Sequence, residues 1–214
     1  MANYAYNAFI SYKRTPVGKR WMDELFYPLF EEYLNEYTDE NLPIFKDTEE
    51  IAWGDSFPSK IRNALIHSKC MISICTPSYF KRSEWCMREF SVMKYRADRL
   101  GFYTDKNPNG LVFPILFRTI DPYPPFIRNV QILDYTNFNV AEIKQSGSEY
   151  LQFQRKLETD VKKLADFINQ VPPWNAEWEK AEWIDQPYNL FVQQLIEYKQ
   201  VKPQLSDTPQ LPAQ

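Results

Sequence analysis

The feature that most constrains the fold of this chain is the alternation of short apolar runs with longer stretches of helical periodicity. The runs Tyr6–Ser11, Leu42–Phe45, Lys69–Cys75 and Leu111–Phe117 have the length and composition of buried strands. Amphipathic stretches separate them, so each strand reaches the next through a helical crossover. The pattern predicts an α/β domain with a central parallel sheet and helices on both of its faces.

Two prolines and one weak strand complete this prediction. A short fifth strand is expected at Ile132–Tyr135, which gives a flavodoxin-like sheet of about five strands. Pro114 lies within the run Leu111–Phe117, where it predicts a bulge. Pro28 lies within the helical pattern Trp21–Tyr37, where it predicts a kink or a break.

The remaining core elements follow from capping signals and periodicity. Thr76-Pro77 is expected to close the strand Lys69–Cys75. Ser83 is a suitable N-cap for a helix that runs from Glu84 to about Leu100. A last core helix is expected from about Glu149 to Val171.

The composition changes after Val171 and predicts three parts. Residues 1–171 form the predicted domain. Residues 172–200 are expected to be a tryptophan-rich helical extension that packs on the domain, with a final helix at Asn189–Lys199. The sequence leaves open whether this extension senses a trigger or covers an apolar edge. Residues 201–214 are rich in Pro and Gln and are expected to be a disordered tail.

The overall composition excludes several classes of protein. Net charge is -3 and the basic residues are scattered, which argues against a nucleic-acid partner. The chain has no apolar stretch of membrane-spanning length and no signal-peptide layout, so no membrane association and a cytoplasmic location are expected. Cys70, Cys75 and Cys86 are interpreted as reduced thiols, His67 as structural, and no metal site is expected. Neither a P-loop nor a glycine-rich dinucleotide motif is present.

Three segments resemble the TIR (Toll/interleukin-1 receptor) family. Ala8–Tyr12 resembles the opening strand and following loop of that family, and Lys46–Gly54 with its flanks resembles the family's BB loop. Trp85–Glu89 follows the family pattern Trp-x-x-x-Glu at a helix start. The resemblance covers residues 6 to about 171 and implies the three-layer TIR fold. The chain most resembles stand-alone bacterial TIR proteins of the Thoeris anti-phage type.

This resemblance implies that NAD⁺ is a substrate and that no cofactor is needed. The implied reaction is hydrolysis or cyclisation, with release of nicotinamide and formation of ADP-ribose or a cyclic ADP-ribose-type signal for a downstream effector. The resemblance also implies self-association through TIR–TIR contacts, which completes the site.

Glu89 is the implied catalytic residue, and Trp85 is an implied substrate-binding residue. A spacing of four places both on one face of the predicted helix. That face lies about 100° from the apolar stripe of Cys86, Phe90 and Met93, so it borders the core without joining it. A fixed anion there would stabilise oxocarbenium character on the ribose, and the Trp85 ring would suit a cationic nicotinamide.

The other implied substrate-binding residues lie on two loops. Ser11, Lys13 and Arg14 follow the first strand and are expected to contact ribose or phosphate. Asp47 and Trp53 lie in the BB loop and are expected to close over substrate or reach a neighbouring subunit.

Two further functions remain open from the sequence. A non-catalytic TIR would act as an assembly scaffold through its BB loop and helices. A nucleoside-processing enzyme with a flavodoxin-like fold would use similar glycosidic chemistry.

Overall fold

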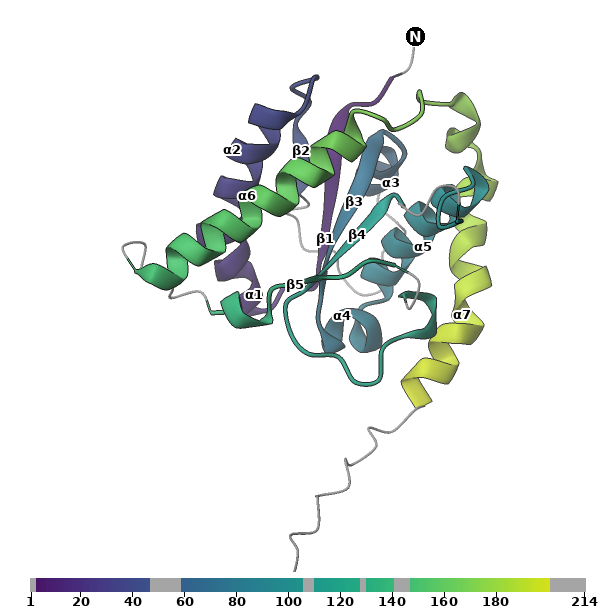
Figure 1. Ribbon diagram of the computed structural model, residues 1–214. Coiled ribbons are helices and arrows are strands. Elements are labelled where there is room, and N and C mark those ends of the chain that lie inside the picture. The colour runs from purple at the N-terminus through teal and green to yellow at the C-terminus, as the bar shows by residue number, and fades with distance from the viewer. Residues whose placement is uncertain (1–2, 47–58, 106–109, 128–129, 141–146, 201–214) are drawn as a thin grey trace, which may run out of the picture.

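The computed structural model describes residues 3–46, 59–105, 110–127, 130–140 and 147–200. A parallel sheet in the order β2-β1-β3-β4-β5 forms its centre (Figure 1). The strands are β1 (Tyr6–Tyr12), β2 (Ile44–Lys46), β3 (Ser68–Cys75), β4 (Val112–Leu116) and β5 (Leu133–Asp134). Because the chain starts near the middle and builds outward to both edges, this is the flavodoxin-like order, and the predicted fold class is confirmed.

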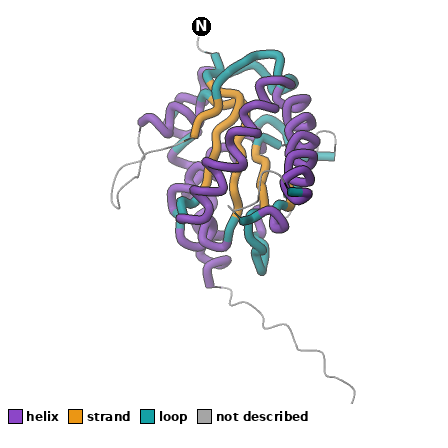
Figure 2. Tube along the Cα trace, turned by 90° about the vertical axis from the view of Figure 1, so that its left-hand side faces the viewer, coloured by secondary structure: helices purple, strands orange, loops and turns teal. Residues whose placement is uncertain are grey.

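Helices cover both faces of the sheet and give three layers (Figure 2). The α-helices are α1 (Pro16–Trp21), α2 (Tyr27–Tyr37), α3 (Ser59–Ile66), α4 (Pro77–Arg82), α5 (Glu84–Arg99), α6 (Ser148–Ile168) and α7 (Asp185–Gln200). A π-helical turn, η1 (Met22–Phe26), joins α1 to α2. Short 3₁₀ turns are η2 (Pro125–Ile127), η3 (Thr136–Phe138), η4 (Ala176–Glu179) and η5 (Ala181–Trp183).

The two faces of the sheet have separate cores because alternate strand residues point to opposite sides. On one face, α1, α2 and α6 pack over Ile10 and Ile72, and Trp21 and Phe153 are fully buried there. On the other face, α3, α4, α5 and α7 pack over Phe9 and Met71. We call these the α6 face and the α5 face.

Pro28 is accommodated without the predicted break. It lies in the first turn of α2, directly after a change in helical hydrogen-bond pattern. The π-helical turn η1 precedes it, and the Tyr27 N–H donates to the Met22 carbonyl five residues back. The chain therefore stays helical from α1 to α2.

Pro114 lies within a regular ladder rather than the predicted bulge. The Leu111 carbonyl accepts from Met71 N–H at 2.8 Å, and Phe117 N–H donates to the Cys75 carbonyl at 3.0 Å, so the odd-numbered residues of β4 face β3. Pro114 is even-numbered and faces the β5 side, where pairing begins only at Ile115. Its missing N–H therefore removes no bond to β3.

The structure differs from the sequence prediction at several helix ends. Thr76-Pro77 does not simply close a strand, because Thr76 caps α4 and Pro77 is its first residue. The last core helix ends at Ile168 and α7 begins at Asp185, each a few residues before the predicted position.

Residues 172–200 pack along the α5 side of the domain. Trp178 and Ile184 form a small apolar cluster with Ile66 and Val92. The guanidinium of Arg96 is buried beside it, 4.7 Å from the Trp178 ring centroid, and donates to four backbone carbonyls from Leu65 to Lys69. These contacts attach the segment to the sheet. The predicted tail 201–214 lies outside the described residues.

His67 contributes to the same attachment. Its ring stacks on Trp174 with centroids 5.0 Å apart and planes 8° apart. Its Nδ1 lies 3.0 Å from the Asn3 carbonyl oxygen. His67 therefore has a structural role, packing against Trp174 and the start of the chain.

Candidate functional site

Three polar side chains meet on the α5 face, near the carboxyl ends of the central strands. Ser11 comes from the end of β1, Tyr79 from α4 directly after β3, and Glu89 from the second turn of α5. Parallel strands bring their carboxyl ends to one edge of the sheet, and ligands of open α/β folds bind at that edge. All three residues are at least 94% buried, with exposed fractions of 1%, 0% and 6%.

Hydrogen bonds connect the three side chains into one chain that ends on Glu89. The Ser11 hydroxyl donates to Glu89 Oε2 at 2.5 Å. The Tyr79 hydroxyl lies 2.9 Å from Ser11 Oγ and 3.3 Å from the Cys86 carbonyl oxygen. Since the Ser11 proton goes to the carboxylate, the single Tyr79 hydroxyl proton is shared between Ser11 Oγ and the Cys86 carbonyl oxygen. The Glu89 carboxylate is thereby held in one orientation.

Capping residues position the two helices that meet here. Thr76 accepts from Tyr79 N–H at 3.0 Å, and Ser83 accepts from Cys86 N–H at 3.3 Å. With Pro77 at the first position, these caps stop α4 after Arg82 and start α5 at Glu84. The turn between them places Tyr79 and Glu89 against the same residue of β1.

Burial keeps the neighbouring acidic groups protonated. Burial is the main cause that raises the pKa of Tyr79 well above its usual value, so its hydroxyl remains a donor. Burial likewise raises the pKa of the Cys86 thiol, with the negative charge of Glu89 as the next cause. Cys86 is therefore a packing residue, not a nucleophile.

Glu89 lies deeper than its helical position predicts. The wheel places it beside the apolar stripe of α5, but the short helix α4 packs across that border. Tyr79 is buried together with Ser11, Cys86 and Glu89, and its place in this cluster was not predicted from the sequence. The Thr-Pro capping signal at Thr76 was the available clue, because it starts a helix with Tyr79 in its first turn.

Trp85 shares a helix face with Glu89 and is half-buried. The guanidinium carbon of Arg88 lies 5.9 Å from the Trp85 ring centroid and only 4.2 Å from that of Tyr188 on α7. Arg88 therefore lies between one aromatic ring of α5 and one of α7.

The basic side chains of the loop after β1 lie in two different surroundings. The positive charge of Lys13 acts to lower the pKa of the Cys86 thiol, against the larger effect of burial, which raises it. Arg14 instead contacts the hydroxyl of Tyr12, whose ring packs on the α6 face. The structure thus brings Ser11 to Glu89 and turns Arg14 toward Tyr12. Asp47 and Trp53 lie outside the described residues.

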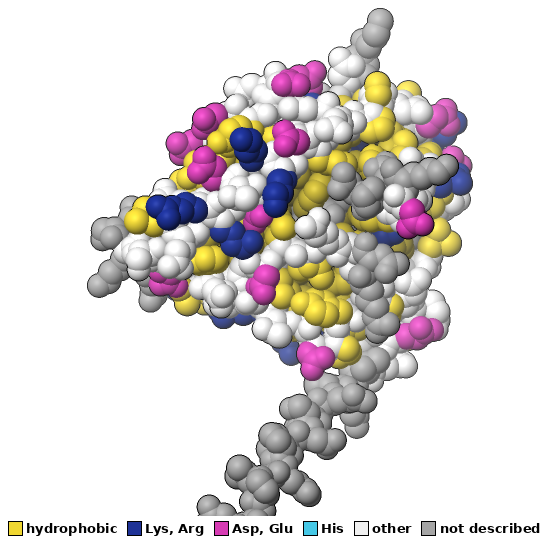
Figure 3. All heavy atoms as spheres, in the orientation of Figure 1, with side chains coloured by type: hydrophobic (Ala, Val, Ile, Leu, Met, Phe, Trp, Pro, Cys, Tyr) yellow, Lys and Arg dark blue, Asp and Glu magenta, His cyan; other side chains and the backbone are white. Residues whose placement is uncertain are grey.

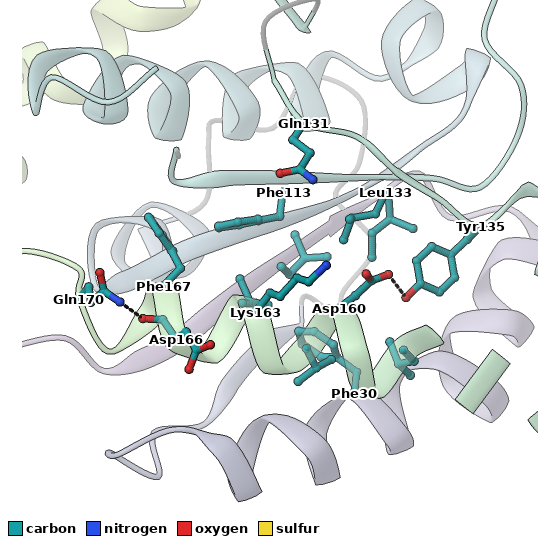
Figure 4. Close-up of a pocket in the computed structure, with 15 residues that line it drawn as sticks. Phe30, Phe113, Gln131, Leu133, Tyr135, Asp160, Lys163, Asp166, Phe167 and Gln170 are labelled. Carbon is teal, nitrogen blue, oxygen red and sulfur yellow. Dashed lines mark hydrogen bonds between the residues drawn. The ribbon is translucent and has the colours of Figure 1, made fainter. Parts of the chain in front are cut away.

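A groove of about 370 Å³, lined by both apolar and polar side chains, lies elsewhere, between α6 and the β4–β5 edge (Figure 4). Ile72 and Ile115 line it, so it opens on the α6 face, opposite Glu89. In Figure 3, apolar surface shows beside the charged side chains of this face. The groove is separate from the Ser11–Tyr79–Glu89 cluster.

Among the described residues, no group of three His, Cys, Asp or Glu side chains is placed to hold a metal ion. None of the helices in the same residues is long and apolar enough to cross a membrane.

The model of the TIR domain family matches residues 8–146, which is more than half of the chain. The chain therefore belongs to the TIR domain family. No curated protein sequence matches it.

Two solved structures are similar to the chain. One is the TIR domain of the Toll-related receptor TRR-2 from Hydra magnipapillata, with 20% identity over 73% of this chain and 98% of that one, and a TM-score of 0.46. Another is the TIR domains of the activated Roq1 resistosome that directly recognises the pathogen effector XopQ, with 18% identity over 75% of this chain and 84% of that one, and a TM-score of 0.35. The family assignment rests on the family model.

Proposed function

We propose that this TIR domain cleaves NAD⁺ at its nicotinamide–ribose bond, with Glu89 as the catalytic residue. TIR domains can be NAD⁺ hydrolases. The observation that carries the proposal for this chain is the buried Glu89 carboxylate, which Ser11 orients through a 2.5 Å hydrogen bond and Tyr79 supports through Ser11.

This arrangement suits a dissociative glycosidic cleavage. As nicotinamide departs, positive charge develops on the ribose, and a fixed anion in a site with little water stabilises it. The ring nitrogen of NAD⁺ carries a positive charge, so nicotinamide leaves as a neutral molecule and no strong general acid is required. One well-oriented carboxylate is therefore sufficient. Its electrostatic contribution is about 3–4 kcal/mol by analogy with oxyanion-hole deletions.

The remaining substrate contacts belong to the same proposal. Trp85 offers an aromatic surface to the cationic nicotinamide ring. Ser11, Lys13 and Arg14 contact ribose or phosphate, and Asp47 and Trp53 close over the substrate or reach a neighbouring subunit. After nicotinamide departs, water gives ADP-ribose and an internal nucleophile of the substrate gives a cyclic product.

TIR domains self-associate, and we propose that a second TIR domain completes the site of this chain. Glu89 is only 6% exposed, so in this proposal association has to open the site to substrate. The same burial favours the second candidate function, a non-catalytic scaffold in which Glu89 has a structural role.

The proposed setting is bacterial anti-phage defence of the Thoeris type, in which the product signals to a downstream effector. The support for this setting is the resemblance of the three sequence segments.

Product analysis distinguishes these functions. The protein is incubated with NAD⁺ over a wide range of protein concentrations, as wild type, as Glu89→Gln and as Glu36→Gln, an exposed glutamate on α2 that serves as the matched control. The proposal expects nicotinamide release by the wild type and by Glu36→Gln, and loss in Glu89→Gln. Oligomers without turnover at any concentration would establish the scaffold, and turnover of nucleosides but not of NAD⁺ would establish a nucleoside-processing enzyme.

A further inference from the structure

The C-terminal helix α7 packs along α5, the helix that bears Glu89, and one of its contacts there is a cation between two aromatic rings. Arg88, the residue before Glu89, has its guanidinium carbon 4.2 Å from the Tyr188 ring centroid and 5.9 Å from that of Trp85. Figure 1 shows α7 running beside α5. The position of Arg88 between the two rings determines how far it covers Trp85.

The Arg88 guanidinium lies closer to the ring of Tyr188 than to that of Trp85, although a tyrosine ring attracts a cation less strongly than an indole ring. Indole is the best aromatic partner for a cation. Trp85 also lies three residues before Arg88 on the same helix, where side chains are neighbours without any long-range packing. The contact with Tyr188 therefore depends on where α7 places that ring.

Packing holds α7 in this position. Leu195 and Tyr198 are buried against the α5 face, with exposed fractions of 3% and 2%. The Phe191 ring lies 5.7 Å from that of Phe126, and Asp185 at the helix start lies 3.8 Å from Arg62. The Tyr188 ring is thus presented to Arg88 by an anchored helix.

The Arg88 guanidinium also forms an ion pair with an acidic side chain of its own helix. Glu84 accepts from Arg88 Nε at 3.1 Å and from Nη2 at 2.7 Å. The Glu84 side chain is 56% exposed, so water screens this ion pair. Glu84 and Tyr188 together keep Arg88 on the side of α5 that faces α7.

We propose that Tyr188 limits how closely Arg88 approaches the Trp85 ring, whose centroid lies 5.9 Å from the guanidinium carbon, and thereby sets the affinity of the Glu89 site for NAD⁺. This inference rests on the proposed function, in which the cationic nicotinamide ring stacks on Trp85. A closer approach of Arg88 to that ring would place a second cation where the nicotinamide binds. Arg88 and Tyr188 are positioning residues, and Tyr188 lies outside the part of the chain that matches the family model.

Calorimetric titration with NAD⁺ tests the proposal in the full chain, in a Glu89→Gln background that prevents turnover. Tyr188→Ala raises Kd about three- to fivefold, the range expected for a shift of one exposed cation–π contact. Tyr188→Phe keeps the ring and the wild-type Kd. Adding Arg88→Met to Tyr188→Ala restores the Kd, because the displaced cation is then gone.

Each other outcome overturns the proposal. A mere loosening of α7 would raise Kd in Tyr188→Ala without rescue by Arg88→Met. An unchanged Kd in Tyr188→Ala, or no binding of NAD⁺ at all, would also contradict it. The proposed function fails separately, when the protein with Glu89 intact binds NAD⁺ in the expected pattern but releases no nicotinamide.

Discussion

The two faces of the sheet differ in what they bury at the same end of the strands. On the α6 face, Trp21 stacks on Phe26 with centroids 4.9 Å apart, and its surroundings are aromatic. On the α5 face, the corresponding region buries two hydroxyls and a carboxylate. Burying polar groups is costly even when they are hydrogen-bonded. The aromatic packing of the α6 face therefore stabilises the fold at this end of the sheet. The α5 face loses some stability by burying the polar groups that hold Glu89 in place.

The largest expected effect is on the stabilising face. Trp21→Ala removes a fully buried ring and should lower the free energy of unfolding by about 3–5 kcal/mol. Urea denaturation measures this loss. Val17→Ala, at a position that is 37% exposed, is the control and should change stability by less than about 0.5 kcal/mol. A loss below about 1 kcal/mol in Trp21→Ala would show that the α6 face is not the main source of stability.

The pH dependence of stability should involve both faces, with one buried thiol, Cys70, on the α6 face and two, Cys75 and Cys86, on the α5 face. Burial raises the pKa of the Cys70 and Cys75 thiols to about 12. The thiol pKa in the unfolded chain is about 8.5. Because the native state holds these protons more tightly, their stabilisation is complete below about pH 8.5 and is lost as the pH rises toward the native pKa.

Urea denaturation between pH 8 and pH 10 measures this loss, which should reach about 1.4 kcal/mol per pH unit for each thiol once the unfolded thiols ionise. Cys70→Ala and Cys75→Ala should each reduce the slope by the share of one thiol. A slope that neither substitution changes would show that other groups cause it.

Two tyrosines allow a matched test of the difference between the faces. The Tyr79 hydroxyl supports Glu89 through Ser11, and the Tyr135 hydroxyl on the α6 face donates to Asp160 at 2.9 Å. Tyr79→Phe and Tyr135→Phe should each cost about 1 kcal/mol of stability. Only Tyr79→Phe should also slow nicotinamide release, by about tenfold, equivalent to about 1.4 kcal/mol. Equal rates in the two variants would remove Tyr79 from the site.

The smallest expected effect concerns the groove on the α6 face. Lys163 extends from α6 at its mouth (Figure 4). Lys163→Ala should change stability by less than about 0.5 kcal/mol and leave nicotinamide release unchanged, because the groove opens away from Glu89. Loss of turnover in this variant would mean that the groove, rather than the α5 face, contains the site.

The sheet could be predicted from the sequence because strands such as Lys69–Cys75 are continuous apolar runs between polar turns. The helix α4 was missed because Thr76-Pro77 ends one element and starts the next. Periodicity gives the face of a residue on its own helix, so the pairing of Trp85 with Glu89 was predictable. Periodicity does not predict which other helix or strand packs against that face.

The contacts that define the site are long-range and were beyond sequence reasoning. Ser11 and Glu89 come from different elements, and only the parallel topology brings them together. The stack of Arg88 on Tyr188 depends on where α7 returns to the domain. Neither contact leaves a local signal in spacing or composition.

The rate of nicotinamide release from NAD⁺ tests the central claim most directly, compared between the wild type and Glu89→Gln at equal concentrations of folded protein. Loss of the fixed anion should slow release by about 10²–10³-fold, the range seen when one electrostatic stabiliser is removed. Circular dichroism and urea denaturation establish that both proteins are folded. Equal rates of release in folded wild type and folded Glu89→Gln would contradict the assignment of Glu89 as the catalytic residue.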